Sequence, residues 1–284
     1  MAALLWKLRE RTLDLGERGL LMGVLNVTPD SFSDGGEFFD TERAVAHGLQ
    51  MFSDGAQIID VGGESTRPGA AGISADEELK RVLPVIDKLR SAAPEALISI
   101  DTSKAVVARA ALDAGASIIN DITGGRGDDA MLKLAAQRKA GFIIMHMLGT
   151  PRTMQDAPHY DDVVAEVREF FRQQYGRALD SGIDPMAIAF DPGIGFGKTL
   201  EHNLELLRSL SKLRVEGRPL VVGVSRKSFL GKVIGSAERE DRLAPTIALS
   251  ALLRGRGANV LRVHDVKPNA AALRIAEALH APAA

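Results

Sequence analysis

Residues 97–121, LISIDTSKAVVARAALDAGASIIND, contain one complete strand–helix–strand pattern. The runs 97–101 and 117–121 are mainly apolar without strict alternation, which is typical of parallel strands buried on both faces. Between them, residues 105–114 are helix-like and end before Gly115, a residue type that tolerates the left-handed conformation found at helix ends. Both predicted strands end in an aspartate. The stretch therefore predicts a βαβ unit with carboxylates at the carboxyl ends of its strands.

The same alternation continues on both sides of this unit. Further strands are predicted at 20–27, 56–61, 141–146, 187–191, 219–224 and 259–263. Further helices are predicted at 41–54, 76–91, 129–139, 160–181, 200–212, 240–256 and 268–279. This order favours an α/β fold, a single (β/α)₈ TIM barrel, whose active site lies at the carboxyl ends of its strands. A doubly wound open sheet is the alternative, but no G-x-G-x-x-G follows the first strand.

Length and composition favour one domain covering residues 1–284, with residues 1–19 as an N-terminal capping segment below the barrel. Hydrophobic residues make up 45% and charged residues 25%, as in an ordinary soluble protein with a sizeable core. A net charge of −2 without runs of like charge argues against nucleic-acid and membrane-surface partners. With no cysteine, a disulfide framework, a zinc–thiolate site and a cysteine nucleophile are excluded. We expect a cytoplasmic protein, because no signal peptide or membrane span is recognisable.

Short polar motifs follow the predicted strands. They are NVTPDSFSDGG (26–36), GGESTRPG (62–69), DTSK (101–104), NDITGG (120–125), DPGIGFGKT (191–199), GVSRKS (223–228) and RVHD (262–265). DPGIGFGKT resembles the end of a phosphate-binding loop, but Pro192 stands where the first glycine is required. We instead expect its glycines to let the backbone approach a flat ligand.

Carboxylates are the first group of candidate site residues. Asp60, Asp101, Asp121 and Asp191 each end a predicted strand, and Asn26 and Asn120 lie at comparable depth. Such positions converge on one pocket, where buried carboxylates require cations, a metal or a ligand rich in N–H donors. A heterocycle with adjacent ring N–H and amino groups would satisfy one carboxylate in bidentate fashion. Metal binding is the alternative, which we expect only near Asn26.

Cations and flexible loops form the second group. Arg226 and Lys227 follow the seventh strand, where Ser225 or Ser228 is expected to cap the next helix, and Arg262 and His264 follow the eighth strand. Two neighbouring loops thus offer positive charge to a diphosphate or carboxylate. The first two motif loops are rich in Gly, Ser, Asp and Pro, and are expected to act as lids. His146 is interpreted as a core histidine.

From about residue 21 to 266 the chain resembles the dihydropteroate synthase family, the sulfonamide-target enzymes of folate synthesis, with all of the motifs above in order. The resemblance implies a transferase that moves a dihydropterin-methyl group from its diphosphate ester to 4-aminobenzoate. The products would be diphosphate and 7,8-dihydropteroate. It also implies Mg²⁺ as cofactor and a homodimer formed through helices near the C-terminus.

The resemblance further assigns individual residues. Pterin binding falls to Asp101, Asn120, Ile122, Met145, Asp191, Phe196 and Lys227. Diphosphate binding falls to Asn26, Thr66, Arg262 and His264, with Asn26 as the Mg²⁺ ligand. Aminobenzoate binding falls to Phe32, Thr66, Arg67, Pro68 and Ser228. Catalytic roles fall to Asp101, Lys227, Arg262 and His264.

Two other functions are compatible with a pterin pocket. A pterin-dependent methyltransferase that serves a corrinoid protein has a similar barrel, but would not need Arg67, Lys227 and His264 together for a leaving diphosphate. A non-catalytic pterin-binding paralogue would keep the pocket and lose residues of the lids or the anion site. No such loss is visible in the motifs.

Overall fold

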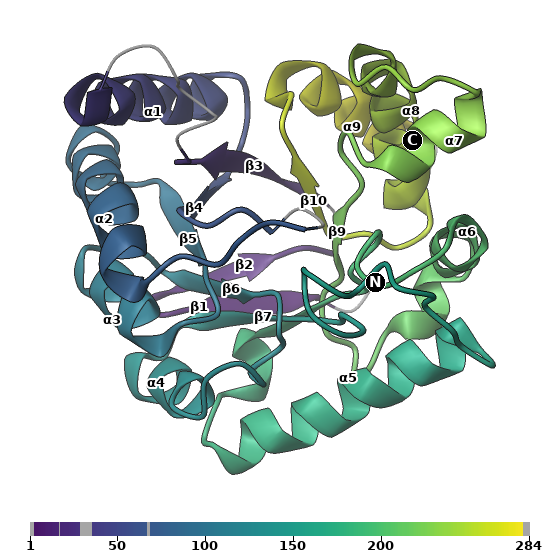
Figure 1. Ribbon diagram of the computed structural model, residues 1–284, viewed down its shortest axis with the longest axis horizontal. Helices are drawn as coiled ribbons and strands as arrows, with labels where there is room; N and C mark the ends of the chain where they lie inside the picture. Colours follow the sequence, from purple (N-terminus) through teal and green to yellow (C-terminus); the bar gives the residue numbers. More distant parts are fainter. Residues whose placement is uncertain (1–2, 17, 29–35, 67–68, 281–284) are drawn as a thin grey trace.

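The computed structural model describes residues 3–16, 18–28, 36–66 and 69–280, with helices arranged around a central ring of strands (Figure 1). An eight-stranded parallel sheet has the order β8-β7-β6-β5-β4-β3-β10-β9. The strands are β3 (Leu20–Asn26), β4 (Ile58–Gly62), β5 (Leu97–Asp101), β6 (Ile118–Asp121), β7 (Gly141–Met145), β8 (Ile188–Asp191), β9 (Val221–Gly223) and β10 (Val260–Val263). Every predicted strand is present, and its bounds agree with the prediction to within about two residues.

The sheet closes on itself between its first and last strands. Phe190 of β8 forms a parallel bridge with Leu220, and its backbone N–H donates to the carbonyl of Pro219 at 2.9 Å. Leu220 lies immediately before β9, so the ring is complete. The predicted (β/α)₈ barrel is confirmed, and the open sheet is excluded.

Helices cover the outside of the ring. They are α1 (Gly36–Ser53), α2 (Ala75–Ala92), α3 (Ala105–Asp113), α4 (Met131–Arg138), α5 (Val163–Asp180), α6 (Leu200–Arg208), α7 (Ser228–Ile234), α8 (Leu243–Gly255) and α9 (Val266–His280). Local chemistry explains several ends: Ser74 and Asp162 accept hydrogen bonds from the first turns of α2 and α5, and Gly115 has a φ of 110° just after α3. The short helix α7 falls outside the predicted helix ranges, although a helix was expected to start near Ser225 or Ser228. None of the described helices is long and apolar enough to cross a membrane.

An N-terminal hairpin closes the bottom of the barrel. Strands β1 (Leu5–Leu8) and β2 (Arg11–Asp14) pair antiparallel, and Trp6 and Leu8 pack on the first residues of the barrel strands. Trp6 also donates from Nε1 to the carbonyl of Ala187 at 3.0 Å. A Cβ at Gly141 would lie 2.2 Å from Leu8, so glycine at this position lets the hairpin pack closely. The predicted capping segment is confirmed, and the opposite end of the barrel carries the polar motifs.

Candidate active site

Arg262 stands at the centre of a charged network inside the barrel mouth. From β10, its Nε donates to Asp60 at 2.6 Å and its Nη2 donates to Asp101 at 2.7 Å. Asn120 of β6 donates to the same Asp60 oxygen at 3.0 Å. Four of the predicted polar residues therefore meet in one network, in which Asp60 joins Asn120 to Arg262, and Arg262 joins both to Asp101.

Burial controls the electrostatics of this network. It raises the pKa of Asp101 to about 7, because Arg262 only partly offsets the desolvation and Asp60 adds a like charge. The pKa of Arg262 is raised despite burial, since both carboxylates stabilise its cation. Asp60 Oδ1 is buried and has no hydrogen-bond partner among the described residues. A buried acceptor without a donor costs free energy, so a ligand rich in N–H donors would be favoured in the mouth.

Asp191, Lys227 and Phe196 form the other side of the mouth. Burial raises the pKa of Asp191, with Lys227 as the main opposing influence, and burial lowers the pKa of Lys227 to about 8. Lys227 Nζ donates to the carbonyl of Ile194 and lies 4.7 Å from the centre of the Phe196 ring. The charges of Arg262 and Asp101 also act on Lys227, which links the two sides electrostatically.

Apolar side chains line the space between these polar groups. Ile122, Met145 and Phe196, which were predicted together, pack in one cluster with Met147 and Met154. Methionine and aromatic side chains form a polarisable apolar surface suited to a flat ring. The cluster lies at the end of β7 and on the loops that follow β6, β7 and β8.

Asp121 does not join the other strand-end carboxylates. It is buried, and its carboxylate accepts hydrogen bonds from Thr123 N, Thr123 Oγ1 and Gly125 N at 2.7–3.0 Å. Successive strand residues face opposite sides, so Asn120 and Asp121 cannot both point into the mouth. The expectation that Asp121 contributes to the pocket was wrong; it holds the NDITGG loop.

The glycines of DPGIGFGKT allow the loop after β8 to pack closely against the loop after β7. A Cβ at Gly193, where φ is 61°, would lie 1.9 Å from the carbonyl oxygen of His146, and one at Gly197 would lie 2.7 Å from that of Leu148. At these two positions the glycines approach protein backbone, so packing between the loops already requires them; the expected approach of this loop to a flat ligand stays a prediction.

Lys198 is enclosed by the same loop. It donates to His146 Nδ1 and Gly193 O, both at 3.0 Å, and to Phe196 O at 2.9 Å. Burial lowers the pKa of Lys198 well below its ordinary value, yet all of these partners are acceptors, which favours the charged ammonium. His146 is buried and its pKa is lowered to about 2, first by burial and then by Lys198. His146 is therefore a neutral core histidine, as interpreted from the sequence.

The loops after β9 and β10 are tied to one another. Ser225 Oγ accepts from the backbone N–H of His264 at 3.2 Å and lies 3.0 Å from His264 Nδ1, so we assign the serine proton to this second contact and the imidazole proton to Nε2. Burial and then Arg262 lower the pKa of His264 to about 3. His264 is therefore a neutral donor, contrary to the expectation of a second cation.

The start of α7 also differs from the prediction. Lys227 occupies the N-cap position, and no side chain there accepts a capping hydrogen bond. The Ser225 hydroxyl is hydrogen-bonded to His264. Ser228 is exposed and borders a shallow depression beside α7. The predicted serine cap was wrong. Arg226, at a φ of 58°, joins the two loops through a bidentate ion pair with Asp265.

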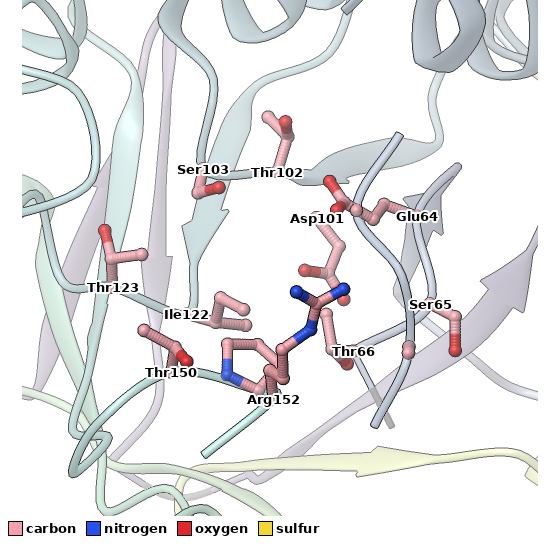
Figure 2. Close-up of a pocket in the computed structure, with 13 residues that line it drawn as sticks. Glu64, Ser65, Thr66, Asp101, Thr102, Ser103, Ile122, Thr123, Thr150 and Arg152 are labelled. Carbon is pink, nitrogen blue, oxygen red and sulfur yellow. The ribbon is translucent and has the colours of Figure 1, made fainter. Parts of the chain in front are cut away.

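A cavity of about 310 Å³ opens beside the charged network (Figure 2). It is lined by Glu64, Ser65, Thr66, Ala70, Gly72, Asp101, Thr102, Ser103, Ile122, Thr123, Thr150, Pro151 and Arg152. Of the predicted site residues, Thr66, Asp101 and Ile122 line it. Figure 2 shows the guanidinium of Arg152 projecting into this space. Phe32, Arg67 and Pro68 lie outside the described residues.

Asn26 ends β3, beside Gly62 of β4, and is partly exposed. Its amide oxygen is a ligand type that Mg²⁺ accepts, and Mg²⁺ commonly takes only one or two protein ligands together with substrate phosphates. No group of three or more His, Asp or Glu side chains able to hold a metal occurs in the described part of the chain. Among the described residues, Asn26 therefore fits a magnesium ion shared with substrate, and no dedicated protein cage is formed.

The cavity-lining residues Glu64 and Arg152, and Lys104 next to the lining residue Ser103, were not predicted as site residues. Arg152 comes from the loop after β7, whereas Glu64 and Lys104 belong to the quoted motifs GGESTRPG and DTSK. Glu64 and Lys104 form an ion pair. Their presence in motifs at two adjacent strand ends was the available signal.

Comparison with known proteins agrees with this geometry. Residues 22–264 match the family described as pterin binding enzyme. The dihydropteroate synthase of Synechocystis is 47% identical over 266 residues, covering 94% of this chain and 92% of its own length. This chain belongs to the dihydropteroate synthase family. The sequence-based resemblance is thereby confirmed, and with it the assignment to a family of transferases.

Solved structures of the family have the same fold. Dihydropteroate synthase of Xanthomonas albilineans with 4-aminobenzoic acid superposes with a TM-score of 0.92 at 43% identity, covering 99% of this chain and 100% of that one. The same enzyme in complex with 7,8-dihydropteroate gives a TM-score of 0.87 at 40% identity, covering 98% and 100%.

Proposed function

We propose that this chain transfers the dihydropterin-6-ylmethyl group from its diphosphate ester to the amine of 4-aminobenzoate, releasing diphosphate and forming 7,8-dihydropteroate. The observation that carries the proposal is a largely buried Asp60–Asp101–Asn120–Arg262 network in the same barrel mouth as Asp191 and Lys227, whose charges act on one another. Solved structures of a relative with 4-aminobenzoic acid and in complex with 7,8-dihydropteroate support the proposed substrate and product.

The pterin is proposed to lie between the two sides of the mouth. Asp191 and Asn120 would hold its N–H and amino groups, and Lys227 would donate to its carbonyl oxygen. Ile122, Met145 and Phe196 would contact its faces, which agrees with their common cluster. Asp60 Oδ1, buried without a partner among the described residues, adds an acceptor for a pterin N–H.

The diphosphate is proposed to lie near the ends of β3 and β10. Arg262 would supply the cation, His264 would donate from Nε2, and Asn26 and Thr66 would complete the site. Asn26 would also hold Mg²⁺, which when bound neutralises charge on the diphosphate. Since Arg262 is paired with Asp60 and Asp101, it would have to share or exchange these partners when diphosphate binds.

The 4-aminobenzoate is proposed to contact Phe32, Thr66, Arg67, Pro68 and Ser228. Thr66 supports this position because it lines the cavity next to Asp101. Ser228 stands at the first turn of α7, which follows directly on Lys227. The arylamine would thus enter from the side of the loop that follows β4.

The bond is proposed to break before the new one forms. The ring nitrogens of the reduced pterin can share positive charge on the adjacent methylene, and the carboxylate of Asp101 would stabilise that charge. Arg262 and His264 would stabilise the leaving diphosphate. A weakly nucleophilic amine then attacks the methylene, and the amine proton is lost. Concerted displacement is the alternative that the same residues could serve.

Product identification tests the proposed function. The protein is incubated with dihydropterin-methyl diphosphate, 4-aminobenzoate and Mg²⁺, and the products are analysed by mass spectrometry. We expect dihydropteroate and diphosphate. Pterin binding without turnover would instead indicate a non-catalytic paralogue, and methyl transfer to a corrinoid protein would indicate a pterin-dependent methyltransferase.

We also propose that the chain works as a cytoplasmic homodimer. The lack of cysteine is compatible with a reducing compartment, and Leu252 of α8 and Ile275 and Leu279 of α9 are exposed large apolar side chains on two adjoining helices. Ile275→Glu, at 62% exposure in the single chain, should shift the mass measured by light scattering toward the monomer without unfolding it. The same mass for Ile275→Glu and wild type at micromolar concentration would contradict this surface as the interface.

A further inference from the structure

A partly buried ion-pair cluster lies beside the cavity and contains none of the proposed catalytic residues. Lys104, the last residue of DTSK, donates from Nζ to Glu78 Oε2 at 2.6 Å and also to Glu64 Oε2. Glu78 lies on α2 with its side chain fully buried, whereas the side chain of Glu64 is 24% exposed. The cluster therefore connects α2 with the loops that follow β4 and β5.

Glu64 extends this connection to the far end of its own loop. Its Oε1 accepts from the backbone N–H of Ile73 at 3.3 Å, just before Ser74 caps α2. Arg81 of α2 donates from Nη1 to the carbonyl of Gly63 at 2.9 Å. Both ends of the loop that contains Thr66 are thus fastened to α2, and Lys104 supplies the contact from the neighbouring loop.

The cavity lies between the two loops that this cluster joins. Glu64, Ser65 and Thr66 line one wall, and Asp101, Thr102 and Ser103 line the other. Figure 2 shows Glu64, Thr66 and Asp101 around the same opening. Lys104 directly follows the second wall, so its ion pair with Glu64 bridges the two walls.

Stability alone explains this arrangement poorly. Enclosing a carboxylate such as Glu78 costs several kcal/mol, and an apolar replacement of a buried ion pair is often neutral or stabilising. Glu78 Oε1 also has no hydrogen-bond partner among the described residues, which adds to the cost. Although burial lowers it, the pKa of Lys104 is raised by its hydrogen bonds to Glu64 and Glu78, so the ammonium remains charged. Because its hydrogen bond to Glu78 fixes the Lys104 ammonium on α2, the ammonium can donate another N–H to Glu64.

We propose that Lys104 is a positioning residue that, through Glu64, sets the separation between the Thr66 wall and the Asp101 wall and so determines aminobenzoate binding. This inference rests on the proposed function, in which Thr66 contacts aminobenzoate. Asn120 and Asp191 lie on β6 and β8, Lys227 follows β9, and Asp101 is held by Arg262, so the cluster makes none of the described contacts to these pterin-binding residues.

The most direct test is Glu64→Ala, which removes the bridge and leaves the buried Lys104–Glu78 pair in place. The KM for aminobenzoate should rise about tenfold or more, because small displacements of a positioned group are costly. The affinity for pterin and the kcat at saturating aminobenzoate should stay within about twofold of wild type. Lys104→Arg should keep the wild-type KM, since a guanidinium can still pair with both carboxylates, whereas Lys104→Gln should raise it.

Asp113→Ala is the matched control. It removes the ion pair with Arg138 at the opposite end of α3, with N–O separation of 2.8 Å, and should leave the KM for aminobenzoate unchanged. Hydrogen exchange of the free protein gives a second readout, in which the Ile73 amide should exchange faster in Glu64→Ala than in Asp113→Ala. This readout needs no turnover, so it separates failure of the inference from failure of the proposed reaction.

An unchanged KM in Glu64→Ala would overturn the proposal. So would a parallel loss of pterin affinity, kcat and melting temperature, because that pattern indicates a general structural role. If the wild-type protein makes no dihydropteroate, the proposed reaction fails first, and unchanged exchange at Ile73 would then reject the bridge as well.

Discussion

Asp191 is the residue on which the proposed pterin binding depends most. Asp191→Asn keeps the side-chain volume but removes the charge and turns one acceptor into a donor, which would set N–H against N–H. We expect pterin binding to weaken by about 2–4 kcal/mol, measured by calorimetry. Since Asp191 also accepts from Gly193 N at 2.7 Å, circular dichroism and the melting temperature must show that the variant is folded. Unchanged affinity in a folded variant would mean that Asp191 serves only the turn.

The lowered pKa of Lys227 predicts how pterin binding depends on pH. Burial lowers this pKa from 10.5 to about 8, so the free protein loses the ammonium above that pH. If the ammonium donates to the pterin, affinity should fall by up to about tenfold per pH unit above pH 8, where Asp101 is already ionised. Lys227→Arg should flatten the profile, because a guanidinium stays charged. A level profile to pH 10 in the wild type would remove Lys227 from pterin recognition.

Strand-end positions were readable from sequence, but side-chain partners were not. Asp60, Asp101 and Asp121 look alike as the polar ends of strands, and only the alternation next to Asn120 separates Asp121 from the others. The pairing of Arg262 with Asp60 could not be read, because β10 and β4 are separated by β3 in the sheet. The neutral state of His264 likewise depends on burial and on Arg262.

At the scale of elements, the loops after β3 and β4 are expected to assemble the aminobenzoate site only when diphosphate and Mg²⁺ are present. Aminobenzoate should then bind weakly to the free protein and more tightly after diphosphate is added, because the first ligand selects the closed arrangement. Calorimetric titrations in both orders of addition measure this. Equal affinity with and without diphosphate would show a preformed site.

Helix α7 shows why some short helices are not recognisable from the sequence. Its seven residues span about two turns, which is too short for a helical period to stand out from the neighbouring apolar residues. The long elements were recognisable because each carries its own period and its own ends, as in α2 with its Ser74 cap. Thr66 was assigned by resemblance, and the pair of Glu64 with Lys104 required the spatial proximity of two loops.

At the scale of the whole molecule, the N-terminal hairpin is predicted to belong to the same cooperative unit as the barrel. Trp6 is fully buried and donates to Ala187 O, so Trp6→Ala should lower the free energy of unfolding by about 3–5 kcal/mol. Denaturant unfolding should remain a single transition if residues 1–284 form one domain, as we propose. Separate transitions for hairpin and barrel would contradict this. The kcat should change little, because the hairpin lies at the opposite end from the mouth.

The most direct test of the central claim is a single-turnover measurement in which diphosphate and dihydropteroate are quantified together. With pterin substrate, 4-aminobenzoate and Mg²⁺, we predict one diphosphate released for each dihydropteroate formed, and loss of both in Asp191→Asn at substrate concentrations that saturate the wild type. Pterin substrate that is bound but recovered unchanged, with no diphosphate released by a folded wild-type protein, would contradict the account.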